Sequence, residues 1–236
     1  MVNRSSREPS PGATRPPSPG GRGLPWFNNM FYPVFLNLKN KRVVVIGGGE
    51  VAERKVESLL GTGASITVIS PEVTPRLALL AQEKHIEFRR RAYAPGDCNG
   101  AALVLSATDD PEISRVIFHD ATKAGALVNT ADQPGLCDFI MPAVVRRGDI
   151  TIAISTGGTS PGLAARLRGA ISEIIGPEYA RLAELLSKAR PEIRRKVPDE
   201  QERKALHYRI LDSDIMNCLK RNDTASAERL LREIIE

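Results

Sequence analysis

Three consecutive glycines, Gly47, Gly48 and Gly49, stand where the sequence is best suited to bind a ligand. They follow an apolar, β-branched run at 43–46 and precede a segment that favours a helix, so they predict a tight turn between a strand and a helix. The spacing Gly47-x-Gly49-x-x-Ala52 matches dinucleotide-binding turns, in which glycine permits the sharp turn and lets a pyrophosphate approach the backbone. The helix N-terminus would then offer free N–H groups to the phosphates. A tight turn without a ligand is the weaker interpretation in this strand–turn–helix context.

The end of the second expected strand bears on the choice of nucleotide. Dinucleotide-binding domains usually carry an acid there, about 20 residues after the glycines, which bonds the ribose. Here Ser70 stands at that position and Glu72 follows two residues later, and either side chain could bond a ribose hydroxyl. Neither is basic, so nothing in this stretch favours a 2′-phosphate, and the sequence favours NAD over NADP.

Two further polar segments end the fourth and fifth expected strands. The carboxyl ends of parallel strands form the ligand-binding edge of an open α/β sheet. Thr108 lies in the first segment, where Asp109 or Asp110 alternatively caps the next helix, and capping is the better interpretation of Asp110. Asp132 lies in the second segment. A carboxylate there can orient a substrate, take a proton or meet a metal ion, and turn formation with the Gln-Pro-Gly that follows is the equal alternative.

A third polar segment combines small hydroxyl residues with glycines before an expected helix. It consists of Thr156, Gly157, Gly158, Thr159 and Ser160. Backbone N–H groups in such a segment make a nest that favours anions. The arginines around it are Arg146, Arg147, Arg166 and Arg168. Together they could receive a polycarboxylate. A loop with a helix cap and a solvated basic face is the equal alternative.

Histidine and cysteine give no sign of a metal held by a protein cage. His85, His119 and His207 lie far apart and pair with no cysteine at ligand spacing. The cysteines, at 98, 137 and 218, are odd in number and widely spaced, so they predict neither a disulfide framework nor a CxxC clamp. A reducing cytoplasm is the compartment that we expect.

Apolar periodicity predicts the elements that must position these residues. Strands are expected at 43–46, 64–70, 85–91, 102–106 and 126–130, alternating with helices at 50–60, 73–84 and 111–124. This alternation predicts an α/β fold with a Rossmann-type, doubly wound parallel sheet. Residues 139–145 and 149–155 are expected to pair as an antiparallel hairpin, because the three residues between them, Arg146-Arg147-Gly148, leave no room for a crossover helix. Helices are expected at 162–175, 178–189, 199–220 and 225–235.

Composition excludes several classes of protein. The chain has 236 residues, of which 42% are hydrophobic and 26% charged, and it has no apolar run near the roughly 20 residues of a membrane span. The net charge is +5, and the segment 1–29, with four arginines against one glutamate, contributes +3 of it. Most of the excess positive charge therefore lies in this tail and not in the folded part, which weakens the interpretation that the protein binds nucleic acid. That segment is rich in Pro, Ser and Gly and predicts a disordered tail, with Met30 as an alternative start.

Taken in order, the motifs resemble those of one family. Ala-Thr-Asp-Asp at 107–110, Asn-Thr-Ala-Asp at 129–132, Phe-Ile-Met-Pro at 139–142 and Ser-Thr-Gly-Gly-Thr-Ser-Pro at 155–161 follow the glycine turn and its Glu-Val-Ala-Glu-Arg-Lys continuation. This arrangement resembles the precorrin-2 dehydrogenases, including the N-terminal module of siroheme synthase, over about residues 30–176. The last two motifs are far more specific than the glycine turn.

The resemblance implies NAD-dependent oxidation of precorrin-2 to sirohydrochlorin, a step toward siroheme, and in several members ferrous iron insertion. It implies an intertwined homodimer. It places the essential aspartate at Asp132 and NAD contacts at the turn from Gly47 to Val51, including Glu50, and at Pro71 and Glu72. The methyltransferase module of siroheme synthase is not expected here, so another protein would make precorrin-2.

The expected organisation is a tail at 1–29, an NAD-binding domain at 30–138, a dimerisation and substrate segment at 139–165 and a helical domain at 166–236. A reduced tetrapyrrole with several carboxylates suits an arginine-lined nest opposite the nucleotide, with Asp132 as general base or proton relay. The alternatives are chelation as the main activity, and a tetrapyrrole- or nucleotide-binding protein without turnover. Neither nucleic acid nor a membrane is expected as a partner.

Overall fold

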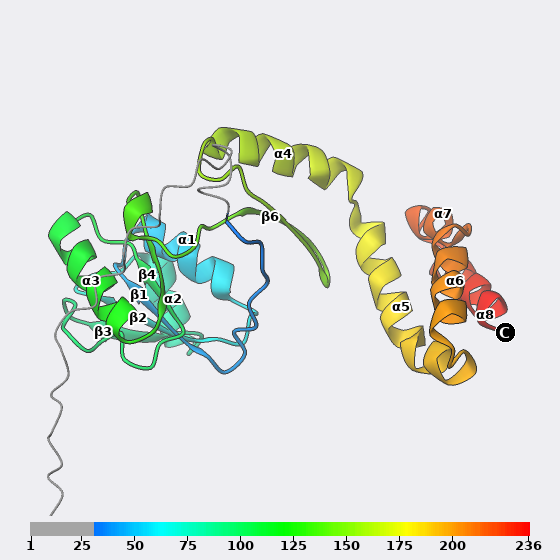
Figure 1. Ribbon diagram of the computed structural model, residues 1–236, viewed down its shortest axis with the longest axis horizontal. Helices are drawn as coiled ribbons and strands as arrows, with labels where there is room; N and C mark the ends of the chain where they lie inside the picture. The colour runs from blue at the N-terminus through cyan, green and yellow to red at the C-terminus, as the bar shows by residue number, and fades with distance from the viewer. Residues whose placement is uncertain (1–30) are drawn as a thin grey trace, which may run out of the picture. The chain divides into compact units, whose positions relative to one another are not determined.

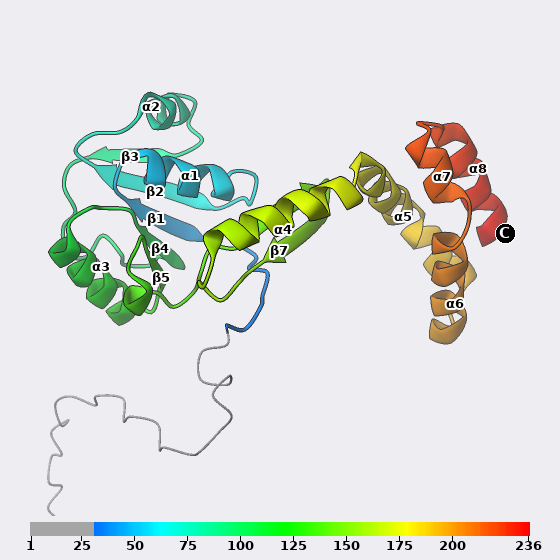
Figure 2. The same cartoon turned by 90° about the horizontal axis from the view of Figure 1, so that it is seen from above.

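Five short strands form the parallel sheet that the alternating pattern predicts. They are β1 (Arg42–Ile46), β2 (Ser65–Ser70), β3 (Glu87–Arg90), β4 (Leu103–Ser106) and β5 (Leu127–Thr130). In the computed structural model, which describes residues 31–236, their order is β3-β2-β1-β4-β5 (Figure 1; all five strands are labelled in Figure 2). The expectations for the tail and for a start at Met30 lie outside the described residues. Because the chain passes from β1 to β2 on one side and β4 lies on the other, the glycine turn after β1 stands at the switch point of the sheet, where α/β folds bind ligands.

Three helices cover the two faces of this sheet. Helices α1 (Glu50–Leu59) and α2 (Pro75–Gln82) lie on one face and α3 (Pro111–Lys123) on the other (Figure 2). The side chain of Thr74 caps α2 by accepting a hydrogen bond from the Leu77 N–H at 3.2 Å. The ends of all three helices fall within two residues of the predicted ones.

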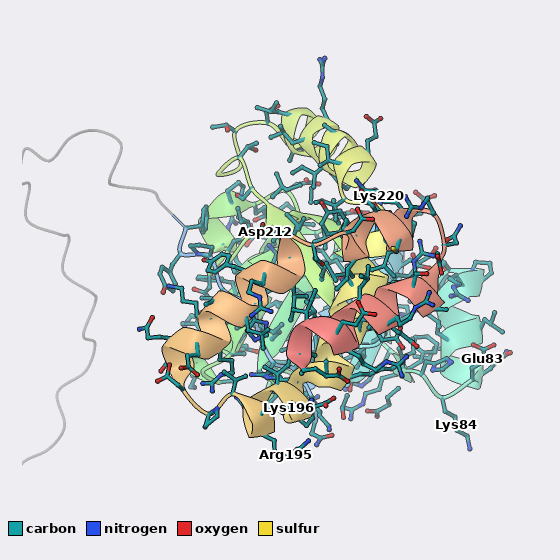
Figure 3. All side chains as sticks on the ribbon, turned by 90° about the vertical axis from the view of Figure 1, so that its right-hand side faces the viewer. Glu83, Lys84, Arg195, Lys196, Asp212 and Lys220 are labelled. Atoms are coloured by element: carbon teal, nitrogen blue, oxygen red, sulfur yellow. The ribbon has the colours of Figure 1, made fainter. Side chains whose placement is uncertain are left out.

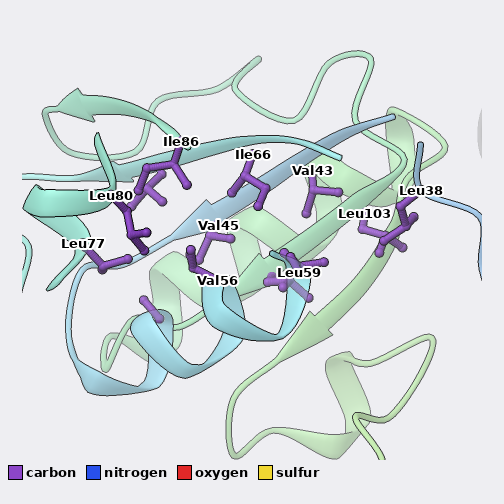
Figure 4. Close-up of a cluster of buried hydrophobic side chains, with 13 residues drawn as sticks. Leu38, Val43, Val45, Val56, Leu59, Ile66, Leu77, Leu80, Ile86 and Leu103 are labelled. Atoms are coloured by element: carbon purple, nitrogen blue, oxygen red, sulfur yellow. The ribbon is translucent and has the colours of Figure 1, made fainter. Parts of the chain in front are cut away.

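The core divides between the two faces because successive strand side chains point in opposite directions. Val43 and Val45 of β1 pack with α1 and α2, in the cluster shown in Figure 4, whereas Val44 and Ile46 pack on the side of α3. All four are almost completely buried, and each such side chain stabilises the fold by about 1.5–3 kcal/mol. The buried strands explain why the sequence shows continuous apolar runs there and no alternation.

The hairpin is present, but its predicted bounds were wrong. β6 (Ala143–Arg147) pairs antiparallel with β7 (Ile150–Ile154), so Arg146 and Arg147 lie in a strand and not in the turn. The turn is the pair Gly148 and Asp149, and Gly148 takes the left-handed φ of +56° that two-residue hairpin turns require. Residues 139–142 are not part of the strand, and Pro142 has no N–H to give to a ladder.

Five helices follow the hairpin: α4 (Pro161–Ile174), α5 (Pro177–Lys196), α6 (Glu200–Leu211), α7 (Ile215–Lys220) and α8 (Thr224–Ile235). Two predictions were wrong here. Helix α5 continues through Pro191 to Lys196, beyond the expected end at 189, and the expected helix at 199–220 is two helices separated at Asp212–Asp214. The boundary expected between residues 165 and 166 falls inside α4.

Helices α5 to α8 share one apolar core. Its fully buried side chains include Ile193, Ile210, Ile215 and Leu219. Charged side chains stand at the helix ends, and Figure 3 shows Arg195 and Lys196 at the C-terminus of α5 and Lys220 at that of α7. Cations at these positions favour the helices, because the free carbonyl groups there carry partial negative charge.

Candidate functional site

The surroundings of the three glycines in the turn differ, and they explain why glycine is needed at two of the positions. Gly47 has a φ of +117°, and a Cβ there would lie 2.3 Å from the Ala107 carbonyl oxygen. A Cβ on Gly48 would lie 1.9 Å from the Glu72 carbonyl oxygen. A Cβ on Gly49 would meet no atom within 4 Å. Packing therefore requires the first two glycines, whereas the third borders open space.

That open space lies at the N-terminus of α1. Gly49 is the N-cap of α1 and provides no side-chain cap, so the first N–H groups of the helix have no partner in the helix. Glu50 is exposed and Val51 is partly buried at this end. Free N–H groups and an unobstructed glycine are what a pyrophosphate needs, and these residues therefore fit a bound dinucleotide.

Only one of the two candidate ribose ligands is accessible. Ser70 is buried, and its hydroxyl oxygen lies 2.8 Å from the position of a Cβ on Gly48, so it stands beneath the turn. Glu72 and the neighbouring Pro71 are exposed. The sequence left both acceptors open, and the folded chain offers the carboxylate of Glu72.

The segment after β4 holds the helix cap that we expected. One carboxylate oxygen of Asp110 accepts hydrogen bonds from the Glu112 N–H at 2.8 Å and the Ile113 N–H at 3.2 Å, which confirms the capping interpretation. The hydroxyl of Thr108 accepts a longer bond of 3.3 Å from the Asp110 N–H. Thr108 is partly buried next to Ala107, the residue against which Gly47 packs, so it lies beside the glycine turn.

Asp132 lies exposed in a loop that follows β5. Its φ is +56°, a left-handed conformation that few non-glycine residues adopt and that Asp and Asn tolerate best. The thiol of Cys137 closes the loop: it accepts a hydrogen bond from the Thr130 N–H at 3.2 Å and lies 3.4 Å from the Gln133 carbonyl oxygen. The loop is thereby fixed with its carboxylate at the ligand-binding edge of the sheet.

One buried polar atom beside this loop is unpaired. Thr130 ends β5 next to Ser106 of β4, and its hydroxyl has no hydrogen-bond partner among residues 31–236. Buried hydroxyl groups without a partner are rare in folded proteins. This one lies at the same edge of the sheet as Asp132.

Sequence reasoning missed a polar pair that joins α1 to β5. The amine of Lys55 donates a hydrogen bond to Oδ1 of Asn129 at 2.5 Å, and Nδ2 of Asn129 donates to the Phe139 carbonyl oxygen at 2.9 Å. Burial lowers the pKa of the Lys55 amine, whereas the nearby Cys137 and Asp132 act in the opposite direction. Helical spacing could have identified Lys55, because it follows the buried Ala52 by three residues.

The segment 156–160 is held by its own hydrogen bonds. The Thr156 hydroxyl donates to the Ser160 carbonyl oxygen at 3.1 Å and accepts from the Ser160 N–H at 3.2 Å. The Thr159 hydroxyl bonds the Thr156 carbonyl, and the Ser160 side chain caps α4. Gly157 and Gly158 both have positive φ. Among residues 31–236, no hydrogen bond or ion pair joins this segment to Asp132 or to the glycine turn.

The arginines near this segment divide into two kinds. Arg147 donates to the Ile175 carbonyl oxygen at 2.8 Å and to the Ser172 carbonyl oxygen at 3.0 Å, so it fastens the hairpin to the end of α4. Arg146 and Arg166 are exposed. Of the two interpretations left open for these arginines, the hydrogen bonds of Arg147 favour a structural role, while Arg146 and Arg166 have guanidinium groups open to solvent.

In residues 31–236, no group of three or more His, Cys, Asp or Glu side chains is placed to hold a metal ion. In the same residues, no helix has the length and apolar character needed to cross a membrane.

Family comparisons agree with the fold. A model of NAD(P)-binding domains matches residues 34–143, a model of the central region of sirohaem biosynthesis proteins matches 147–173, and a model of the sirohaem synthase dimerisation region matches 178–235. These matches confirm the predicted NAD-binding domain and the resemblance found in the motifs.

Similar proteins carry related names. The siroheme synthase of Chromobacterium violaceum is 36% identical over 84% of this chain and 42% of its own length, and that of Azotobacter vinelandii is 37% identical over 85% and 43%. The chain thus spans less than half the length of these curated relatives. A solved structure named SirC, precorrin-2 dehydrogenase, has a TM-score of 0.69 and 27% identity, and the match covers 84% of this chain and 100% of that one.

Proposed function

The chain belongs to the siroheme synthase family, and on that premise we propose that it oxidises precorrin-2 to sirohydrochlorin with NAD as the hydride acceptor. The observation that carries the proposal is the placement of the glycine turn and the Asp132 loop at the same edge of one parallel sheet. Such an edge brings a nucleotide and a second reactant together.

The residues assigned to NAD follow from the space around the turn. The pyrophosphate would lie against Gly49 and the N–H groups of Glu50 and Val51, and Glu72 would bond the adenosine ribose. Bound NAD supplies the hydride acceptor, and the protein's task is to hold it and the substrate in register. Thr108 would contact the nucleotide from the end of β4.

Asp132 is the group that we assign to proton transfer. Oxidation of a reduced pyrrole ring removes a hydride and a proton, and a fixed, exposed carboxylate can accept the proton. The substrate carboxylates would meet Arg146, Arg166 and the N–H groups of segment 156–160. Support for this assignment comes from the charge of these side chains and their exposure.

The test is anaerobic incubation of the protein with precorrin-2 and NAD. The proposal predicts sirohydrochlorin absorbance and one NADH per substrate oxidised. NADH binding without either product would instead favour a binding protein.

Ferrous iron insertion is the second activity that we propose, because the relatives are siroheme synthases and siroheme is the iron complex of sirohydrochlorin. Iron is here a substrate, and the tetrapyrrole nitrogens would supply most of its ligands. Asp132 could accept the pyrrole protons that leave when iron enters. The test is addition of ferrous iron to sirohydrochlorin with the Gly49→Asp variant, in which NAD cannot bind. Iron insertion by this variant would make chelation independent of the dehydrogenase.

A homodimer is the assembly that we propose. The match of residues 178–235 to a dimerisation region supports it, as do three large apolar side chains exposed on α4, those of Leu163, Leu167 and Ile174. Analytical ultracentrifugation would show a mass near twice that of the chain.

The cytoplasmic location stays a prediction. The three cysteines of the described residues are free thiols, which is consistent with a reducing compartment.

A further inference from the structure

Lys55 is a partly buried amine that the mechanism above does not use. It lies on α1, directly after the glycine turn, and its Nζ bonds a side chain 74 residues further along the chain, Asn129 on β5. No ion pair of Lys55 is present among residues 31–236. Taking an amine out of water without an ion-pair partner is costly, so the position needs a reason that an apolar side chain would not satisfy.

Asn129 connects this amine to both ends of the loop that carries Asp132. Asn129 stands three residues before Asp132, is almost completely buried, and donates from Nδ2 to the Phe139 carbonyl oxygen at 2.9 Å. The loop between these two points is closed by the Cys137 thiol. Asn129 therefore helps to hold both ends of the loop, one as part of β5 and the other through its hydrogen bond to Phe139.

The charges that face Lys55 come from two elements. Arg54, its neighbour on α1, disfavours the ammonium form, and Cys137 and Asp132 of the loop favour it. Burial acts against the ammonium and lowers the pKa of Lys55. Of the two loop groups that favour the ammonium, Asp132 contributes a carboxylate, whose charge attracts the Lys55 ammonium.

We infer that Lys55 is a positioning residue for the reaction: its ammonium group, bonded to Asn129, holds the Asp132 loop in place and supplies the positive charge that balances the Asp132 carboxylate. The inference rests on the proposed function for its effect on catalysis, and it adds a link between the helix that receives the nucleotide and the loop that receives the proton. It also explains why a lysine stands where Met or Leu would fill the same space.

The kinetic test compares Lys55→Met with Lys55→Arg. The first keeps an unbranched side chain, one atom shorter than lysine, and removes its charge, and the second keeps the charge. Lys55→Met should lower kcat for NADH formation about tenfold or more, the cost of losing a hydrogen bond to a charged group. The dissociation constant of NADH should not change, and Lys55→Arg should recover most of the loss. Glu57→Gln, at an exposed position of α1 that does not act on the pKa of Lys55, is the matched control and should leave kcat unchanged.

The pH dependence of kcat distinguishes a role of the Lys55 charge from a role of its side chain in filling space. The wild-type kcat should fall as the pH rises through the lowered pKa of the Lys55 amine, because only the ammonium form carries the charge that favours the Asp132 carboxylate and strengthens the bond to Asn129. This alkaline limb should be absent in Lys55→Met and should move to higher pH in Lys55→Arg. The same limb in Lys55→Met as in the wild type would overturn the inference.

A second measurement does not depend on turnover. Trace acetylation of the protein as a function of pH, read by mass spectrometry, reports the titration of each lysine, with the exposed Lys84 (Figure 3) as reference. Asp132→Asn should shift the half-labelling of Lys55 to lower pH and leave Lys84 unchanged, because it removes a charge that favours the ammonium. No shift would overturn the inference. If the wild-type protein forms no NADH from precorrin-2, the proposed function fails, and this labelling result decides the inference by itself.

Discussion

Replacing single glycines of the turn should separate packing from nucleotide binding. Gly48→Ala places a methyl group 1.9 Å from the Glu72 carbonyl oxygen, where ordinary contact begins at 3.4 Å, so the chain between β2 and α2 has to move. Overpacking of this kind lowers the free energy of unfolding by about 1–3 kcal/mol. In a chain of this size each kcal/mol lowers Tm by about 2–4 °C, so we expect Tm to fall by roughly 2–12 °C.

Gly49→Ala should behave in the opposite way. Its methyl group meets no atom within 4 Å, and the φ of Gly49 is −80°, which alanine adopts freely. Alanine is the poorer N-cap, but it also reduces the freedom of the unfolded chain by about 0.4–1 kcal/mol, so the two effects nearly cancel. The methyl group does occupy the space assigned to the pyrophosphate. Loss of hydrogen bonds to a charged group should weaken NADH binding about 10- to 100-fold.

Two assays on the same samples check both statements. Thermal unfolding without ligand gives the packing effect, and NADH fluorescence titration gives the dissociation constant. In the wild type, NADH at 100 times its dissociation constant should stabilise the fold by about 2.7 kcal/mol, and Gly49→Ala should lose most of this gain. Wild-type NADH affinity in Gly49→Ala would refute the placement of the nucleotide. An unchanged Tm in Gly48→Ala would refute the packing argument.

Three further substitutions test other parts of the chain. Asp132→Asn keeps a residue that tolerates the left-handed φ and removes the charge, so NADH formation should fall at least about 100-fold while NADH still binds. Arg147→Met removes two hydrogen bonds to carbonyl groups at the end of α4 and should lower the free energy of unfolding by about 1.5–3 kcal/mol, measured in urea. A hydrogen bond from Arg91 lowers the pKa of Asp97, so the stability from this carboxylate is present above about pH 4 and is lost as the pH falls through the lowered pKa. The Tm difference between wild type and Asp97→Asn should therefore shrink toward acid pH.

Matched controls make these results specific. Arg146→Met changes the exposed neighbour of Arg147 and should leave the urea midpoint unchanged. Asp149→Asn changes an exposed carboxylate in the hairpin turn that makes no ion pair among residues 31–236, and should leave the Tm at neutral pH unchanged. Equal losses in Arg146→Met and Arg147→Met would contradict the role assigned to Arg147. A constant Tm deficit of Asp97→Asn across the pH range would contradict that of Asp97.

Two errors in the sequence analysis share one physical origin. Arg147 was expected in the hairpin turn, yet strand pairing takes it into β6 and its guanidinium donates to carbonyl groups at the end of α4. Helix α5 continues past Pro191 because packing of Ile193 in the C-terminal core outweighs the hydrogen bond that proline cannot make. Tertiary contacts overrode a local signal in both places.

By itself, the sequence determined the parallel sheet, the glycine turn, the caps and the edge at which Asp132 stands. These features depend on neighbouring residues: apolar periodicity, a glycine between strand and helix, and an acid before a helix. The tertiary structure alone decided that Gly48 packs against the Glu72 carbonyl group, that Ser70 is buried beneath the turn, and that Lys55 donates a hydrogen bond to Asn129. Each of these contacts joins residues far apart in the chain, so it exists only after the strands have paired and the helices have packed, and no local pattern can encode it.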